Sequence, residues 1–71
     1  MIEFNKEVEL SDRIIHIHSE LGKWIVEEYD FFGGAWIMTL DVGLKRIAKY
    51  GGEELRSKVQ KEIDKFKSIS S

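Results

Sequence analysis

The pattern of hydrophobic and polar positions is most pronounced in the stretch from Ser11 to Asp30. On a helical wheel at about 100° per residue, its apolar side chains fall on one broad arc and most of its charged side chains on the other side. The apolar positions are Ile14, Ile15, Ile17, Leu21, Trp24, Ile25, Val26 and Tyr29. The arc spans about 200°, wider than the roughly 100° stripe that covers a single core. We therefore predict a long central helix that contacts neighbours on two sides.

A β-hairpin is the alternative interpretation of the same stretch. It would have strands at Arg13–Ser19 and Trp24–Tyr29, with a turn at residues 20–23. The abundance of β-branched residues supports this alternative. However, apolar residues are adjacent at 14–15 and at 25–26, which strict alternation does not explain. The pattern over the long window favours the helix.

The second half of the chain predicts two more helices. The stretch from Ala35 to Tyr50 places most of its apolar side chains on one face. Thr39 or Asp41 could instead be the N-cap of this helix, which would leave Ala35–Met38 extended. Glycine pairs at 33–34 and 51–52 supply residues that commonly end helices. The stretch from Glu53 to Lys67 carries a narrower apolar stripe of about 80°.

Residues 1–10 follow a period of two, which predicts an extended arm or a short strand, with a short helix as the alternative. A single strand has no ladder partner in an otherwise helical chain, so we expect it to pair with a second copy or to lie across the helices. The predicted fold class is therefore all-α. It is a small three-helix bundle over residues 11–67, with an extended N-terminal arm, a frayed tail at 68–71 and a dimeric state.

All three predicted helices contribute apolar side chains to the predicted core, which consists of Ile14, Leu21, Trp24, Ile25, Trp36, Ile37, Leu40, Leu44, Ile47, Leu55, Val59, Ile63 and Phe66. Gly22 and Gly43 lie inside predicted helices, where a glycine costs about 1 kcal/mol relative to alanine. We expect each to mark a close helix crossing. Glu28 is expected at the rim of the apolar arc, in contact with water.

The length of 71 residues fits one domain whose core supplies only a few kcal/mol of net stability. No cysteine is available to reinforce it. Self-association as a homodimer or larger assembly is a plausible source of further burial. The amino terminus lacks the pattern of a signal peptide, and the longest uncharged run, Phe31–Leu40, is too short to cross a bilayer. We expect a soluble, cytoplasmic protein.

The uncharged corner between the first two predicted helices gathers aromatic residues around two glycines. One interpretation is that the rings cap the end of the bundle. The functional interpretation is an interaction patch, since aromatic side chains anchor protein interfaces. The predicted partner-binding residues are Phe31, Phe32, Trp36, Met38 and Val42. The predicted function is a non-enzymatic protein-interaction or regulatory module that self-associates and binds itself or another protein.

The net charge of −2 hides an asymmetry: residues 1–41 carry three basic and nine acidic groups, and residues 42–71 carry eight basic and four acidic groups. Attraction between acidic and basic helices explains this asymmetry without a ligand. The alternative function is a nucleic-acid-binding regulator that uses the basic second and third helices. The residues for such contacts are Lys45, Arg46, Lys49, Lys58, Lys61 and Lys65.

Candidate chemistry is sparse. Ser, His and Asp occur without the spacing of a catalytic triad, and no glycine-rich cofactor loop is present. On a strand, the rings of His16 and His18 would face one side and could share a metal ion, whereas on a helix they are about 200° apart. The sequence offers no evident third ligand. We therefore predict no catalytic residue, no cofactor and no metal site.

Overall fold

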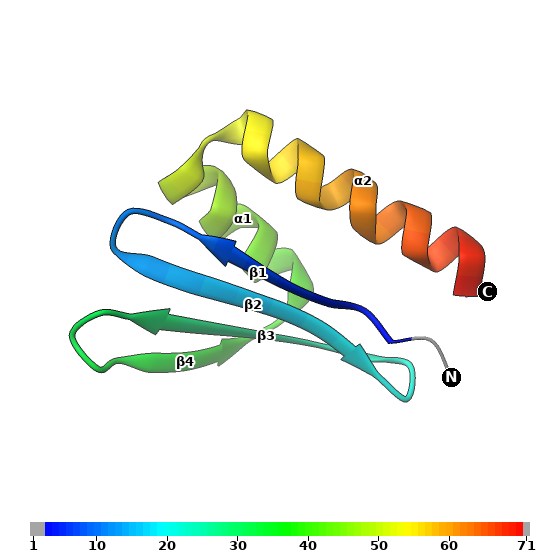
Figure 1. Cartoon of the computed structure of the whole chain (residues 1–71), viewed down its shortest axis with the longest axis horizontal. Coiled ribbons are helices and arrows are strands. Elements are labelled where there is room, and N and C mark those ends of the chain that lie inside the picture. Colours follow the sequence, from blue (N-terminus) through cyan, green and yellow to red (C-terminus); the bar gives the residue numbers. More distant parts are fainter. Residues whose placement is uncertain (1–2, 71) are drawn as a thin grey trace.

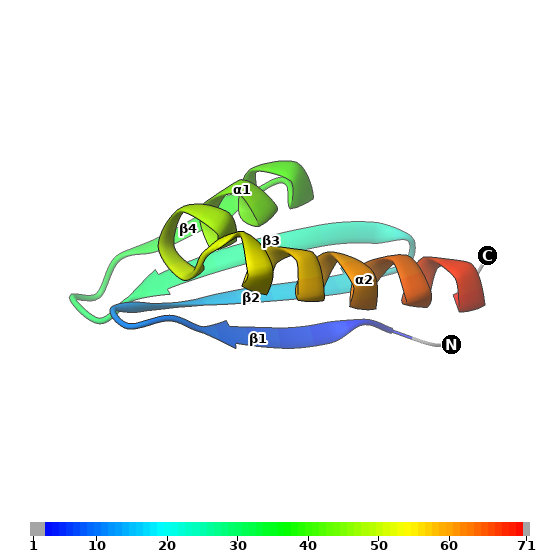
Figure 2. The same ribbon diagram turned by 90° about the horizontal axis from the view of Figure 1, so that it is seen from above.

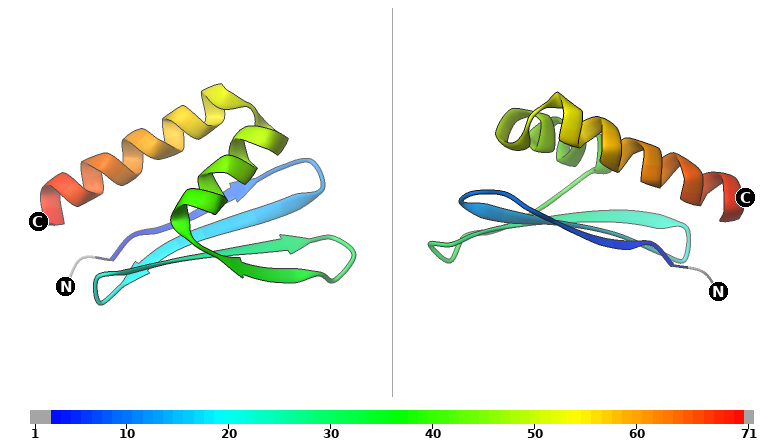
Figure 3. Two further views of the ribbon diagram at one scale, coloured as in Figure 1. Left: turned by 180° about the vertical axis from the view of Figure 1, so that it is seen from behind. Right: turned by 45° about the horizontal axis from the view of Figure 1, so that its top comes forward.

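The computed structural model describes residues 3–70 and shows a four-stranded antiparallel sheet with two helices on one of its faces (Figures 1 and 3). The elements are β1 (Asn5–Glu9), β2 (Arg13–Glu20), β3 (Lys23–Asp30), β4 (Ala35–Met38), α1 (Leu40–Gly51) and α2 (Glu53–Ser70). The strand order is β1-β2-β3-β4, so each strand pairs with the next one along the chain. The fold is α+β, and the prediction of an all-α helical bundle is wrong.

The stretch predicted as a central helix is the hairpin of β2 and β3. Leu21 and Gly22 connect the strands with φ angles of 52° and 79°. Two consecutive residues with positive φ form the type I′ turn, whose twist matches that of the flanking strands. The hairpin aligns Glu20 with Lys23. The β-hairpin, which was the alternative to a central helix, is therefore the correct interpretation of this stretch.

Adjacent isoleucines in β2 lie on opposite faces of the sheet. Ile15 and Ile17 are buried beneath the helices, while Ile14 lies on the face that no helix covers. Successive side chains of a strand alternate between faces, so a sheet with apolar residues on both sides shows adjacent apolar pairs in its sequence. These pairs are what made the stretch resemble a broad amphipathic helix.

The N-terminal segment with a period of two forms β1. Its partner is β2 of the same chain, with Val8 opposite Ile15. The expectation that this strand needs a second copy to complete a ladder is wrong. That expectation followed from the assignment of β2 to a helix, which left β1 without a strand to pair with in the same chain.

The second and third predicted helices are present as α1 and α2, but the first turn of the second is replaced by β4. The Thr39 side chain accepts a hydrogen bond from the Val42 N–H, which fixes the start of α1. At the other end, the Gly52 N–H donates to the Ala48 carbonyl. Within residues 3–70, neither helix is both long and apolar enough to cross a membrane.

The core lies between the helices and one face of the sheet. The buried apolar residues are Val8, Ile15, Ile17, Val26, Leu44, Ile47, Val59 and Ile63. The four that α1 and α2 contribute were predicted, and the four that the sheet contributes were not. Of the predicted core residues, Leu21, Trp36 and Ile37 are instead exposed. Figure 2 shows α2 on the side of β1 and β2 and α1 on the side of β3.

Gly43 allows α1 to approach β3 closely. A Cβ atom at this position would lie 2.7 Å from Cγ1 of the buried Val26. The predicted close approach is therefore present, although the neighbour is a strand rather than a helix. Gly22 serves the β2–β3 turn and has nothing near its Cα that a Cβ would meet, so the prediction of a helix crossing there is wrong.

Candidate functional site

The uncharged run Phe31–Leu40 forms the β3–β4 turn, the edge strand β4 and the start of α1. Its large side chains are unusually exposed: 94% of the Phe32 surface and 78% of the Ile37 surface contact solvent, as does 49% of Trp36. We call the set Phe31, Phe32, Trp36, Ile37 and Val42 the β4 surface. Four of the five predicted partner-binding residues belong to it, and the fifth, Met38, is half-buried.

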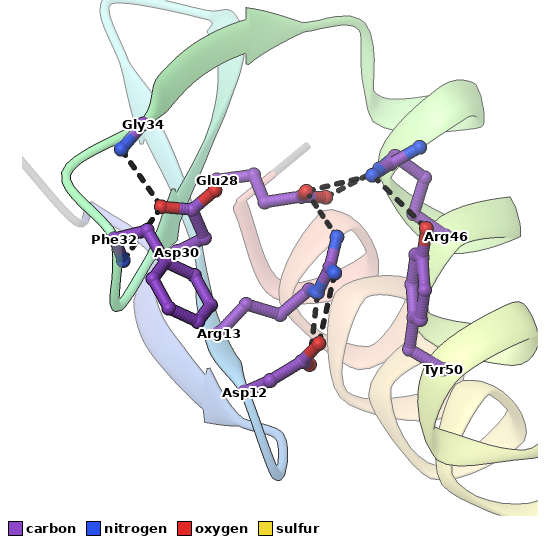
Figure 4. Close-up of polar contacts among 8 residues, drawn as sticks. All are labelled: Asp12, Arg13, Glu28, Asp30, Phe32, Gly34, Arg46 and Tyr50. Atoms are coloured by element: carbon purple, nitrogen blue, oxygen red, sulfur yellow. Dashed lines mark hydrogen bonds and ion pairs between the residues drawn. The ribbon is translucent and has the colours of Figure 1, made fainter.

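Asp30 fixes the turn that presents the two phenylalanines. Its Oδ1 atom accepts hydrogen bonds from the N–H groups of Phe32, at 3.0 Å, and Gly34, at 2.7 Å (Figure 4). The Trp36 ring packs on Gly34, where a Cβ atom would lie 2.5 Å from the ring. The turn and the tryptophan therefore have defined positions, although both are exposed.

The outer edge of β4 offers backbone groups to a further strand. Asp30 donates its N–H to the Gly34 carbonyl. Hydrogen-bonded and non-hydrogen-bonded pairs alternate along an antiparallel ladder, so Trp36 and Met38 bond to β3 while Ala35 and Ile37 point their N–H and C=O groups outward. Natural edge strands are commonly protected by charges or proline. This edge has neither.

A shallow hollow lies beside this edge. It has a volume of about 400 Å³ and is lined by Trp36, Ile37 and Met38 from β4 and by Val42 and Arg46 from α1. The β4 surface is thus a ridge of exposed apolar side chains with a concave region next to it. Such a shape suits contact with another polypeptide better than it suits chemistry on a small molecule.

The residues predicted for nucleic-acid contact lie on the two helices. Arg46 is not available for such a contact, because its guanidinium group binds the buried Glu28. The other five are exposed lysines, Lys45 and Lys49 on α1 and Lys58, Lys61 and Lys65 on α2. Acidic residues are interspersed among the α2 lysines at Glu62 and Asp64, and Glu62 forms an ion pair with Lys6 of β1.

Glu28 has no exposed surface, so the prediction that it reaches water at a rim is wrong. It lies on the helix-facing side of β3 between two arginines. Arg13 Nη1 is 2.9 Å and Arg46 Nη2 is 2.7 Å from its Oε2 atom, and Arg46 Nε binds Oε1 (Figure 4). The hydrogen bond from Arg46 is the largest cause of a lowered pKa for Glu28, which overcomes the opposing effect of burial.

The surroundings of the two arginines complete this buried network. The Arg13 guanidinium group lies 3.8 Å from the centre of the Tyr50 ring and also binds Asp12. Arg46 lies over the same ring at 5.1 Å. The network joins β2, β3 and α1, and all its charges have partners within it. It therefore has a structural role in holding α1 on the sheet.

The uncovered face of the sheet carries the two histidines. Because β2 is a strand, His16 and His18 lie on the same side, and their rings stack in parallel with centres 4.8 Å apart. Glu27 of β3 lies opposite His16. Its Oε1 atom is 3.1 Å from His18 Nε2 and 3.8 Å from His16 Nδ1. One ligand atom from each of the three residues lies within 4.8 Å of the other two.

Two neighbours hold this group in place. The Tyr29 hydroxyl donates to Glu27 Oε2 at 2.5 Å, and His16 Nε2 donates to Asn5 Oδ1 at 2.5 Å. The Tyr29 hydrogen bond is the main cause of a lowered pKa for Glu27, and the two histidines lower it further. The same carboxylate raises the pKa of the Tyr29 hydroxyl.

Glu27 is the member of this group that the sequence analysis did not identify. A signal for it exists: a two-residue turn at Leu21–Gly22 sets the register of the hairpin and thereby places residue 27 opposite residue 16.

Comparisons with protein-family models, with curated proteins and with solved structures found no match to the chain.

Proposed function

We propose that the protein is a non-enzymatic interaction module that self-associates through the edge of β4. The observation that carries the proposal is an uncharged edge strand with exposed Trp36 and Ile37 side chains and outward backbone groups at Ala35 and Ile37. Edge strands of this kind are templates for pairing with another chain. We expect this association to take place in the cytoplasm.

A second copy of the chain fits this edge in an antiparallel arrangement. Ala35 would form a hydrogen-bonded pair with Ile37 of the second copy, and Ile37 with Ala35 of the second copy. Trp36 then lies on the two-fold axis, opposite its own counterpart. A two-fold interface brings one patch against an identical patch, so the absence of charge on β4 avoids like-charge repulsion.

Self-association has more support than nucleic-acid binding. The set of basic residues for nucleic acid loses Arg46 to Glu28, and Glu62 and Asp64 interrupt the α2 lysines. The β4 surface, in contrast, is largely open to solvent, with 94% of Phe32 and 78% of Ile37 exposed. Burying Trp36 and Ile37 would supply the apolar contact that a small domain with a one-sided core lacks.

Sedimentation equilibrium at several concentrations tests the proposal. We expect the wild-type chain to form a concentration-dependent dimer and Ile37→Lys to remain a monomer, because the substitution brings two like charges to the pairing edge. Ile69→Lys on α2 is the matched control, since Ile69 is 62% exposed and α2 lies on the side of β1 and β2, away from β4 (Figure 2). We expect it to dimerise as the wild type does.

Two results would contradict the proposal. One is a wild-type chain that stays monomeric at every concentration. The other is a dimer that both lysine variants weaken equally, which would place the interface elsewhere. Circular dichroism of each variant confirms that the fold is retained before its sedimentation is interpreted.

A further inference from the structure

We infer that the uncovered face of the sheet carries a binding site for a divalent transition-metal ion of the zinc class. The proposed ligands are His16 Nδ1, His18 Nε2 and Glu27 Oε1. Zinc bonds to imidazole nitrogen and carboxylate oxygen at about 2.0–2.2 Å, so tetrahedral ligands lie about 3.3 Å apart. The distances from Glu27 Oε1, 3.1 Å to His18 and 3.8 Å to His16, lie on either side of this value.

The neighbours of His16 and Glu27 leave one ligand atom of each residue toward the rest of the group, and the two parallel histidine rings would turn toward a common point when an ion binds. His16 donates its Nε2 proton to Asn5, which leaves the lone pair on Nδ1, the nitrogen closer to Glu27. Tyr29 occupies Glu27 Oε2, which leaves Oε1 toward the histidines. Metal ligands in proteins are commonly oriented by such hydrogen bonds to their remaining polar atoms. A metal ion would replace the proton between His18 and Glu27.

The donor set indicates the class of metal. Two imidazoles and one carboxylate suit zinc and its first-row neighbours, whereas magnesium and calcium prefer oxygen ligands alone. Three protein ligands leave a fourth position of a tetrahedral ion open. Because both helices within residues 3–70 lie on the opposite face of the sheet, that position is directed toward solvent and would hold water or a group from another molecule (Figure 3).

The charge around the group also favours a cation. Glu7 of β1 lies opposite His16 on the same face, and Glu9 lies opposite Ile14. Together with Glu27 these carboxylates create a negative potential that attracts a divalent ion, while Glu20 and Lys23 of the same face lie opposite each other at the β2–β3 turn. None of the three ligands belongs to the β4 surface, although Glu27 lies opposite Ile37 of that surface on the same face.

Isothermal titration of zinc chloride into the tag-free, metal-free chain tests the inference, since a histidine tag would itself bind zinc. We expect one zinc ion per chain. Removing a ligand in His18→Gln or Glu27→Gln should weaken binding at least a hundredfold. Glu9→Gln is the control: it removes a carboxylate from the same face but not a ligand, and should change the affinity by no more than about threefold.

Tyr29→Phe tests the orienting hydrogen bond and keeps the inference testable if a ligand variant fails to fold. It removes one hydroxyl from an exposed side chain and leaves all three ligands in place. Loss of such an outer hydrogen bond costs about 10–100-fold in metal affinity. Cobalt titration gives a second measurement, because the intensity of its visible absorption distinguishes tetrahedral from octahedral coordination.

Two results would overturn the inference. The first is a wild-type chain without saturable zinc binding. The second is binding that His18→Gln and Glu27→Gln leave unchanged, which would mean that zinc binds to other groups. Titrating Trp36→Lys separates this inference from the proposed function, because residue 36 lies opposite Glu28 on the other face of the sheet. It should bind zinc as the wild type does, whether or not the wild type dimerises.

Discussion

Replacing Glu28 by methionine tests whether the buried carboxylate holds α1 on the sheet. Methionine has a similar volume but leaves the guanidinium groups of Arg13 and Arg46 without their shared acceptor. Removing one partner of a buried ion pair costs about 3–5 kcal/mol. Both arginines keep some contact with solvent, and Arg13 also keeps Asp12. We therefore expect a loss at the lower end, about 3 kcal/mol in the free energy of unfolding.

Such a loss is large for this chain. At about 0.05–0.15 kcal/mol per residue, a chain of 71 residues has roughly 4–11 kcal/mol of stability. With an m-value of about 1 kcal/mol/M, the urea midpoint should fall by about 3 M. The thermal midpoint should fall by about 12–24 °C. Circular dichroism during urea and thermal unfolding measures both shifts.

A double-variant cycle with Arg46→Met shows whether the effect comes from the ion pair. Methionine at both positions removes the unpaired charge together with its partner. Replacing a buried ion pair by apolar side chains is often nearly neutral. We therefore expect the double variant to be more stable than Glu28→Met alone. If the double variant loses the sum of the two single losses, the two residues are not coupled and the reasoning is refuted.

The pH dependence provides an independent check of the same network. The pKa of Glu28 is lowered in the folded state, chiefly by its hydrogen bond with Arg46. Its contribution to stability is therefore fully present above the ordinary glutamate pKa of 4.5 and is lost as the pH falls through the lowered value. The stability difference between the wild type and Glu28→Gln should shrink in this acidic range. A difference that stays constant with pH would contradict the assignment.

Two further substitutions test the close approach of α1 to β3 and the β2–β3 turn, both by urea unfolding. Gly43→Ala should lower the free energy of unfolding by about 1–2 kcal/mol, because the clash of its Cβ with Val26 outweighs the gain of about 1 kcal/mol in helix propensity. An unchanged or higher urea midpoint would show that this approach is not tight. Leu21→Asn should raise the free energy of unfolding by about 1 kcal/mol, because asparagine tolerates the positive φ that leucine adopts in this turn. A lower urea midpoint would contradict the turn geometry.

The two helices were predictable because each carries one apolar face and the glycine pair at 51–52 marks where the first ends and the second begins, whereas the β2–β3 hairpin was not. Its turn is occupied by Leu21–Gly22 rather than Asn–Gly, so the strongest local signal of a type I′ hairpin is missing. Ile14 and Ile15 lie on opposite faces of the sheet, and this conceals the alternation. A helical wheel places such adjacent pairs on one broad arc, so the stretch was assigned the period of a helix instead of that of a strand.

The same error affected the two candidate sites differently. Phe31, Phe32 and Trp36 of the β4 surface could be named as partner-binding residues without the correct fold, because the absence of charge from Phe31 to Leu40 does not depend on it. Ile37 was instead assigned to the core, because a helical period places it on the buried face. The group of His16, His18 and Glu27 depends on strand geometry and on the hairpin register. A helix separates the histidines, so Glu27 had no reason to be considered as a third ligand.

The proposed dimer and the proposed metal site lie on one sheet, and the geometry of that sheet predicts how they relate. If two copies pair through β4, three strand-to-strand spacings of about 4.8 Å separate Glu27 from Glu27 of the second copy, or about 14 Å. One metal ion cannot bridge this distance, and the histidines of β2 lie farther apart still. Each copy should therefore bind its own ion, with the same stoichiometry in monomer and dimer. Zinc should then leave the dimerisation constant nearly unchanged, and a zinc-dependent shift in sedimentation would mean that the copies meet through the uncovered face instead.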